Sequence, residues 1–131
     1  MKKEIVICTV VILVVVLGNM ITQNYTKQCI NTLTIQLSEL KEKISMKEKN
    51  TTKEELEEKS KEIKENWDNM QETLSYYIEH DELEKVETQL TLLEGEMQTK
   101  LYDDAIPEIE KCEFILEHIA DKTALSIKNI F

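Results

Sequence analysis

The chain has 131 residues, and its 16 basic residues are all Lys, against 26 acidic residues, for a net charge of −10. An acidic chain that lacks the planar guanidinium of Arg is a poor match for phosphate backbones, which excludes nucleic acid as a partner. Two Gly and one Pro are too few to punctuate a chain of short strands, so we expect an all-α fold.

The charge is unevenly distributed along the chain. Residues 1–23 and 24–64 each carry a net charge of +1, whereas residues 65–131 hold five Lys and seventeen acids, a net charge of −12. Two interpretations are open. The acidic half is either a solvated helical surface kept soluble by excess charge, or a face that attracts cations or a Lys-rich partner.

The first element is an apolar segment, residues 5–21, which contains no charged residue. Its seventeen residues would reach ~25 Å as a helix, close to the ~30 Å of a hydrocarbon core. A cleavable signal peptide has a similar start, but its exit needs small residues at the cleavage site. The exit Leu17-Gly18-Asn19-Met20-Ile21 lacks that pattern, and we therefore expect residues 1–23 to stay as a signal-anchor embedded in membrane lipid.

Flanking charges predict the orientation of this anchor. Lys2, Lys3 and the terminal amine precede the apolar segment, whereas only Lys27 follows it before Glu39. Because the more positive flank stays in the cytoplasm, we expect a single-pass protein with a cytoplasmic N-terminus and an extracytoplasmic C-terminal domain.

Beyond the anchor, apolar residues recur at steps of three and four, as in helices that bury one stripe in a coiled-coil-like bundle. Ser60 fills one missing slot in the second stripe. The four predicted stripes are Ile30, Leu33, Leu37, Leu40, Ile44; Leu56, Ile63, Trp67, Met70, Leu74, Tyr77; Leu83, Val86, Leu90, Leu93, Met97; and Ala105, Ile109, Cys112, Leu116, Ile119.

Breaks in the phase of these stripes predict where the helices end. We expect a first helix over residues 25–48, which can run on from the anchor as one rod. We expect a long second helix over residues 52–79. Linkers are expected at residues 45–51, 80–81 and 99–102. Such short connections make neighbours antiparallel, so the domains are an anchor (1–23), a juxtamembrane helix with linker (24–51) and an acidic up-and-down helical bundle (52–131).

Capping residues agree with these breaks. Thr52 with Glu55, and Asp81 with Glu84, match the capping-box spacing, in which two free backbone N–H groups are satisfied reciprocally. Asp103 or Asp104 can cap the last helix, which would leave Pro107 in its first turn, where a missing N–H costs little.

The pieces KKEIVI, ITQNYT, SYYIEHDELEKVE, FILEHI and LSIKNIF resemble a family of small clostridial-type bacterial membrane proteins that is known only as a domain of unknown function. The resemblance covers almost the whole chain. It implies a single-span protein of a Gram-positive anaerobe, and it carries over no activity, ligand or catalytic residue.

The two histidines do not predict a metal site. Helical metal sites place a carboxylate or a second His three or four residues from the first, on the same face. Position 77 is Tyr and position 115 is Ile, so His80 and His118 are interpreted as cap or surface residues. The alternative is a weak divalent-cation site at the turn formed by residues 79–82. We expect no resident metal or cofactor.

Cysteine and aromatic residues have ordinary structural interpretations. Cys8 lies in the span and Cys112 on a core stripe, whereas Cys29, just outside the bilayer, is either a free thiol or half of an interchain disulfide in a dimer. Trp67, Met70, Tyr76 and Tyr77 are expected to pack in the core. The apolar tail formed by Leu125, Ile127, Ile130 and Phe131 is expected to cap the bundle or dock on a partner.

No Gly-rich phosphate loop, nucleophile elbow or Cys/His pair is recognisable, so we expect no enzyme. The sequence favours a membrane-anchored helical interaction module of the cell envelope, whose bundle contacts another protein such as an integral membrane protein, with a homodimer also open. The alternative is an extracytoplasmic domain that senses a ligand or a cation.

Overall fold

The computed structural model describes the backbone of residues 1–46 and 51–128 and the side chains as far as residue 124. Within these residues the chain forms helices and no strand. The helices are α1 (Lys2–Ser45), α2 (Lys53–Leu74), α3 (His80–Gln98) and α4 (Tyr102–Lys128). The expected all-α class is thus confirmed, and the apolar tail predicted to cap or dock lies outside the described side chains.

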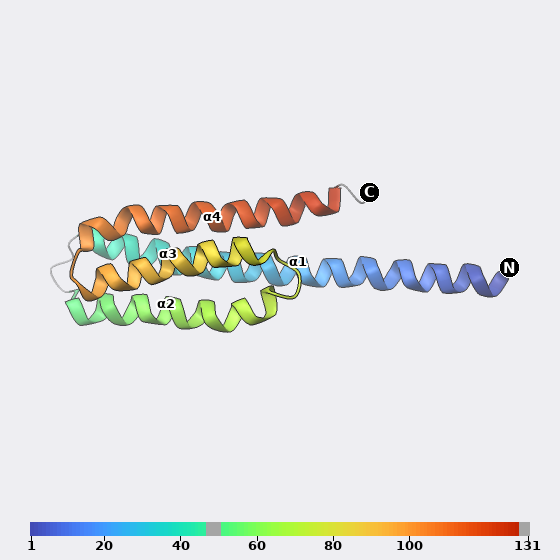
Figure 1. Cartoon of the computed structure of the whole chain (residues 1–131), viewed down its shortest axis with the longest axis horizontal. Helices are drawn as coiled ribbons and strands as arrows, with labels where there is room; N and C mark the ends of the chain where they lie inside the picture. The colour runs from blue at the N-terminus through green and yellow to red at the C-terminus, as the bar shows by residue number, and fades with distance from the viewer. Residues whose placement is uncertain (47–50, 129–131) are drawn as a thin grey trace.

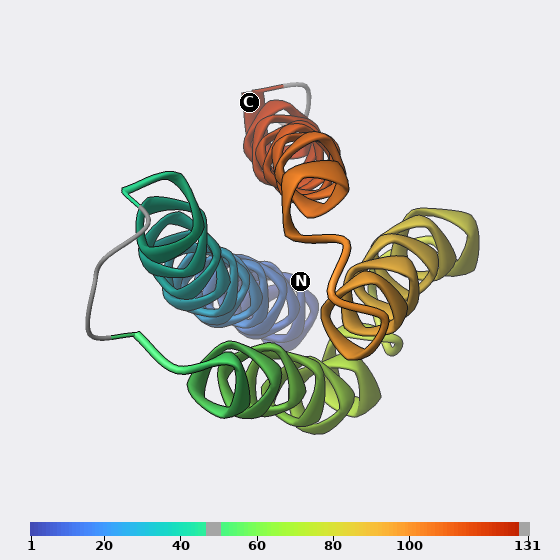
Figure 2. The same ribbon diagram turned by 90° about the vertical axis from the view of Figure 1, so that its left-hand side faces the viewer.

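The helices form an antiparallel up-and-down bundle, as expected (Figure 1). Each helix packs on two neighbours: α1 on α2 and α4, and α3 on α2 and α4. The view along the bundle shows the four helices around a common centre (Figure 2). Because the connections are short, each helix packs antiparallel against the next helix in the chain.

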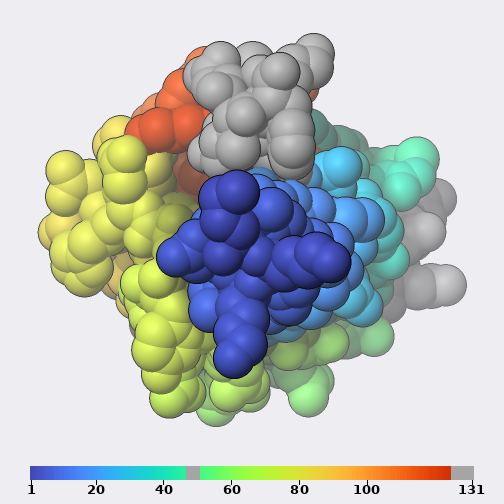
Figure 3. All heavy atoms as spheres, turned by 90° about the vertical axis from the view of Figure 1, so that its right-hand side faces the viewer, coloured from blue at the N-terminus to red at the C-terminus, as the bar shows by residue number. Residues whose placement is uncertain are grey.

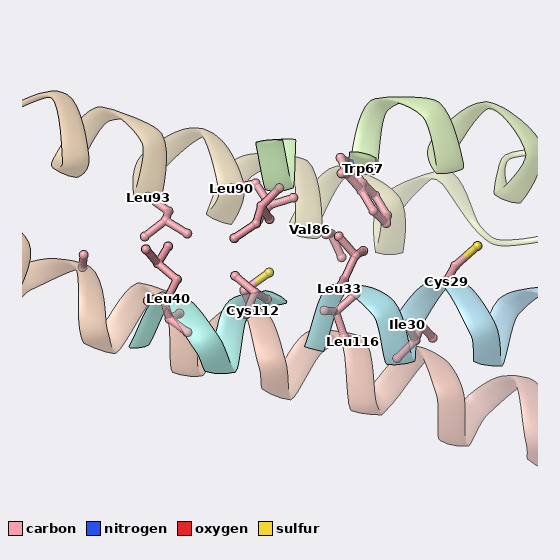
Figure 4. Packing of buried hydrophobic residues seen from close by; sticks show 14 of the residues in the cluster. Cys29, Ile30, Leu33, Leu40, Trp67, Val86, Leu90, Leu93, Cys112 and Leu116 are labelled. Carbon is pink, nitrogen blue, oxygen red and sulfur yellow. The ribbon is translucent and has the colours of Figure 1, made fainter. Parts of the chain in front are cut away.

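The predicted stripes face one another in the core (Figure 4). Every residue of the first, third and fourth stripes is buried, as are Leu56, Ser60, Ile63, Trp67 and Leu74 of the second. Burying a Leu or Ile side chain contributes about 1.5–3 kcal/mol relative to exposing it. The bundle therefore owes its stability to these stripes.

Ion pairs on the rim join neighbouring helices outside the core. Exposed pairs of this kind contribute about 0–1 kcal/mol each to the free energy of unfolding. They therefore add little stability, but they favour this arrangement of neighbouring helices over others. Pairs between helices include Lys41–Glu113 (3.0 Å), Lys59–Glu39 (3.1 Å) and Lys64–Glu87 (2.7 Å).

The start of α2 matches its predicted cap, but its end does not. Thr52 accepts a hydrogen bond from the Glu55 backbone N–H, and the Glu55 carboxylate accepts one from the Thr52 N–H, both at 3.2 Å. The prediction that this helix continues to residue 79 is wrong. It ends at Leu74, where the Ser75 N–H bonds back to the Gln71 carbonyl, and the apolar residues beyond form a turn.

The predicted caps of the last two helices are also wrong. The N-cap of α3 is Glu79 without a side-chain bond, so Asp81 lies in the first turn, where its charge favours the helix dipole instead. Helix α4 begins at Tyr102, which places Asp103 and Asp104 in its first turn and Pro107 in its second. The proline therefore removes one backbone hydrogen bond near the start of the helix.

The connection between α3 and α4 has a specific geometry. Lys100 has a positive φ of 64°, and the Lys100 and Leu101 N–H groups bond to the carbonyls of Met97 and Glu96 at 3.2 and 2.9 Å. This pair of bonds is the Schellman motif, which satisfies the last carbonyls of a helix and usually places Gly at the left-handed position. The sequence has Lys there.

Helix α1 is longer than the bundle. Its C-terminal half supplies the first apolar stripe, whereas its N-terminal half projects beyond the other helices (Figure 1). The N-terminal end of this half faces the viewer in Figure 3. Its most apolar 18-residue window has a mean hydropathy of 2.8 and no buried residue. The apolar segment and the first bundle helix thus form one continuous helix, as expected.

Candidate functional site

The projecting half of α1 exposes an apolar surface, which is unfavourable in water. Its side chains from Ile5 to Ile21 include Val, Leu and Ile residues that are more than half exposed. A contiguous exposed apolar surface of this size marks a contact with membrane or protein. By length and composition this helix can cross a membrane, and a signal sequence would meet the same criteria.

Polar side chains gather where α1 enters the bundle. Thr26 is almost fully buried, and its hydroxyl lies within hydrogen-bond distance, 3.1 Å, of the Tyr77 hydroxyl in the turn between α2 and α3. One residue earlier, Tyr25 shares a hydrogen bond with the thiol of Cys29, which raises the pKa of Tyr25. This cluster holds the α2–α3 turn against α1 at the point where the apolar segment meets the bundle.

Burial raises the pKa of the neighbouring groups as well. It is the main cause of the raised pKa values of Cys29 and Tyr77. Raised values keep both groups neutral at ordinary pH. The cluster thus has no activated thiolate or phenolate, and its chemistry is that of a structural hydrogen-bonded network.

A pocket of about 210 Å³ lies beside this cluster, between the end of the apolar segment, the α2–α3 turn and the end of α4. Asn19 and Thr22 of α1 line one side, Glu79 and Glu82 another, and Lys122 of α4 a third. The three walls come from segments far apart in sequence, which is why no local spacing predicted this pocket. We refer to it as the juxtamembrane pocket because it adjoins the end of the segment that the sequence predicts to span a membrane.

The charged groups of the juxtamembrane pocket differ in how many ion-pair or hydrogen-bond partners they have. Lys122 pairs with Glu79 at 3.0 Å and with Glu82 Oε1 at 3.7 Å, and the hydrogen bond to Glu79 is the main cause of the raised pKa of Lys122. Lys85 also lies 3.4 Å from Glu82 Oε1. Glu82 itself is only 7% exposed, and its Oε2 has no hydrogen-bond partner among the described residues.

The residues of the alternative divalent-cation site, 79–82, are not assembled for metal binding. Glu79 and Glu82 turn to Lys122, while His80 and Asp81 are exposed. Among the described residues, no group of three or more His, Cys, Asp or Glu side chains is placed to hold a metal ion. His118 lies exposed on α4.

The cysteines are three free thiols in separate places. Cys8 is exposed on the apolar half of α1, whereas Cys29 is only 4% exposed. An interchain disulfide through Cys29 would therefore require the bundle to open at the end nearest the apolar segment. Burial raises the pKa of the Cys112 thiol to about 12, as expected for an inert core residue.

The aromatic residues divide between core and surface. Trp67 is fully buried, as predicted, and Met70 is partly buried. The prediction that Tyr76 packs in the core is wrong, because α2 ends before it and its ring is 83% exposed. The same prediction for Tyr77 is also wrong: this residue lies beyond the end of α2 and is 37% exposed, with its hydroxyl on Thr26.

A second, larger hollow of about 650 Å³ lies along the contact between α1 and α4. Most of its lining residues are polar or charged, among them Lys27, Asn31, Glu113 and Glu117, and none is aromatic. Ligand pockets are usually lined by apolar and aromatic side chains. This hollow therefore resembles an open surface groove more than a binding site.

Comparison with known proteins yields a family and no function. No curated protein and no solved structure matches the chain. One family model matches residues 20–130, which is nearly all of the chain beyond the apolar segment. The chain belongs to the family described as "Domain of unknown function (DUF4363)".

Proposed function

We propose that this protein is a membrane-anchored interaction module of the bacterial cell envelope, whose helical bundle contacts another protein and catalyses no reaction. The observation that carries the proposal is the single helix α1, which joins an exposed apolar half to a buried bundle half without a break. A rigid junction of this kind holds the bundle at a fixed place on the membrane.

Two features support retention of the anchor over its removal as a signal peptide. The residues at the exit of the apolar segment are helical, whereas a peptidase needs a small-residue site that this exit lacks. Residues close to that exit also belong to the folded bundle, since the Gln23 side chain donates to the Thr123 carbonyl at 3.0 Å. Cleavage near residue 20 would remove one wall of the juxtamembrane pocket.

We propose that the bundle lies outside the cytoplasm because of the charges that flank the apolar segment. Lys2, Lys3 and the terminal amine outnumber Glu4 before the span. Positive flanks remain inside, so the acidic bundle faces the exterior.

The retained anchor is tested by fractionating cells and sequencing the N-terminus of the protein recovered. We expect the full chain in the membrane pellet after an alkaline carbonate wash, together with loss of the bundle when intact cells are shaved with protease. Mature protein in the culture fluid that begins near residue 20 would contradict the anchor. A bundle protected from protease in intact cells but digested in inverted vesicles would contradict the orientation.

Exposed apolar side chains on the bundle indicate where a partner binds. Phe114 of α4 is 71% exposed, and Ile35 of α1 and Leu92 of α3 are about half exposed. Single exposed apolar residues are common, but an exposed aromatic ring is the type of residue that anchors protein interfaces. Phe114 is therefore the first position to probe.

The partner is tested by placing a photoreactive amino acid at Phe114 and, as a matched control, at exposed Glu58 on α2. Helix α2 does not touch α4 in the bundle. Irradiation of native membranes should give one defined crosslinked product from position 114, identified by mass spectrometry, and none from position 58. A product that contains only a second copy of this chain would identify a homodimer, and the absence of any product from exposed positions on all four helices would count against the module.

A second candidate function, ligand sensing outside the membrane, is favoured by one observation. Glu82 is buried in the wall of the juxtamembrane pocket with one carboxylate oxygen unpartnered. Buried polar groups are nearly always satisfied, so a ligand that supplies a donor there would complete the site. Thermal-shift measurements on the full chain with candidate ligands separate this function from a purely protein-binding one.

A further inference from the structure

We propose that the juxtamembrane pocket binds the headgroup of a membrane phospholipid that carries a primary ammonium, as in the ethanolamine type. This inference rests on the proposed anchor, because it requires the pocket to lie at the membrane surface. It adds a specific lipid ligand to a helix otherwise described only as apolar.

The first step is the level of the pocket. Asn19 and Thr22 line it, and they stand at the end of the uncharged segment of α1. A span of ~25 Å that begins near residue 5 reaches the edge of the hydrocarbon core at this level. The pocket therefore lies among lipid headgroups, which are the ligands present there at the highest concentration.

The second step is the charge of the pocket. Its wall contains two carboxylates, Glu79 and Glu82, and one ammonium, Lys122. Both lysines near Glu82 approach the same oxygen, Oε1, at 3.4 and 3.7 Å. The other oxygen, Oε2, is buried without a donor. A cationic hydrogen-bond donor is the complement of this wall, since hydrogen bonds between charged groups are the strong ones.

The third step is the choice among headgroups. A primary ammonium supplies N–H donors to a carboxylate, whereas the quaternary ammonium of choline has none, and a glycerol headgroup lacks the positive charge. The phosphate of the same lipid would lie toward Lys122, whose side chain is about half exposed beside the two carboxylates. A volume of about 210 Å³ is below the range for drug-sized ligands and suits a small headgroup.

The test uses the full chain in nanodiscs that contain equal amounts of phosphatidylethanolamine, its mono- and dimethyl derivatives, phosphatidylcholine and phosphatidylglycerol, all with the same acyl chains. Lipids retained on the released protein are counted by native mass spectrometry. We expect roughly tenfold preference for the ethanolamine lipid over the choline lipid, the ratio that one lost charged hydrogen bond can produce. The two partly methylated lipids, which keep an N–H, should fall between them.

Glu82→Gln should remove this preference, and Glu84→Gln, an exposed position on the same helix, should keep it. Because the methylation series uses the native chain, it decides the question even if the Glu82 variant does not fold. Equal retention of the choline and ethanolamine lipids, or an unchanged preference in a folded Glu82→Gln variant, would overturn the proposal.

Free phosphoethanolamine has the same polar chemistry and separates the two sources of the headgroup. It should not raise the melting temperature of the detergent-solubilised protein at millimolar concentration. A rise that matches the effect of the lipid would assign the pocket to a soluble ligand and overturn the lipid assignment. Failure of the anchor itself is distinguishable, because the protein would then leave the membrane fraction, whereas failure of this inference leaves it there without a lipid preference.

Discussion

The side-chain amide of Gln23 donates a hydrogen bond to the backbone carbonyl of Thr123, 3.0 Å away and 100 residues later in the chain. The bond joins the last residue before the bundle half of α1 to the end of α4. It makes the exit of the apolar segment part of the folded domain, and it gives the first prediction.

Gln23→Ala should lower the free energy of unfolding of the bundle by about 1 kcal/mol, the usual net contribution of one hydrogen bond. Urea titration of the full chain in mild detergent, followed by circular dichroism, measures the change. Gln28→Ala, at an exposed position one helical turn further on, is the matched control and should change the stability by less than about 0.5 kcal/mol. Equal losses in the two variants would contradict the role of the Gln23 bond.

Trp67→Ala should destabilise the bundle by about 3–5 kcal/mol, because it leaves a large cavity at the centre of the core. The ring is 1% exposed, and its Nε1 has no hydrogen-bond partner among the described residues. Trp67→Phe, which keeps an aromatic ring and removes that donor, should cost much less. Tyr76→Ala, on the exposed turn, should be nearly neutral, and a large loss there would place Tyr76 in the core after all.

Thr52→Ala should cost about 1 kcal/mol, since it breaks the capping box at the start of α2. Asp81→Ala should cost only a few tenths of a kcal/mol. Its carboxylate does not cap α3 and contributes only through the helix dipole. Thermal unfolding of the two variants side by side compares the caps directly, and a larger loss for Asp81→Ala would reverse the assignment.

Lys100→Gly should stabilise the protein by up to about 1 kcal/mol. Lys100 occupies the left-handed region at a φ of 64°, which disfavours any side chain that has a Cβ. Glycine removes that strain, although its greater freedom in the unfolded chain offsets part of the gain. Lys85→Gly, in the interior of α3, is expected to be destabilising by a similar amount, so the two signs together test the geometry of the turn.

The buried thiol of Cys112 should make the folded protein less stable at alkaline pH. Burial raises the pKa of its thiol from 9.0 to about 12, so between these values the unfolded thiol ionises while the folded thiol keeps its proton. The unfolded state is then favoured, and stability falls as pH rises, by at most about 1.4 kcal/mol per pH unit. Denaturation midpoints of the native protein and Cys112→Ala between pH 8.5 and 11 should converge, and parallel curves would contradict the buried thiol.

The bundle was predictable from sequence because each stripe is a local pattern. Leu33, Leu90 and Leu116 lie on helices whose spacing alone identifies the buried face. The end of α2 was not predictable in this way, because Tyr77 continues the apolar spacing past the last helical residue, Leu74. Apolar spacing identifies a face and does not report where the backbone stops.

The candidate site was less predictable than the fold. Glu79 and Glu82 were considered together as part of a cation site, but the residue that decides their surroundings is Lys122, some forty positions later. Asn19 completes the pocket from the other end of the chain. Such a site arises from the register of α1 against α4, which depends on packing and leaves no mark in local spacing.

The unbroken α1 has a mechanical consequence. Its 44 residues correspond to a rod of about 66 Å, of which the proposed membrane span takes about 25 Å. Because the helix has no break, any tilt of its apolar half also tilts its bundle half. With the proposed anchor in place, the flanks of the bundle would face proteins that diffuse in the plane of the membrane, whereas the connection at Lys100 would lie at the end farthest from it.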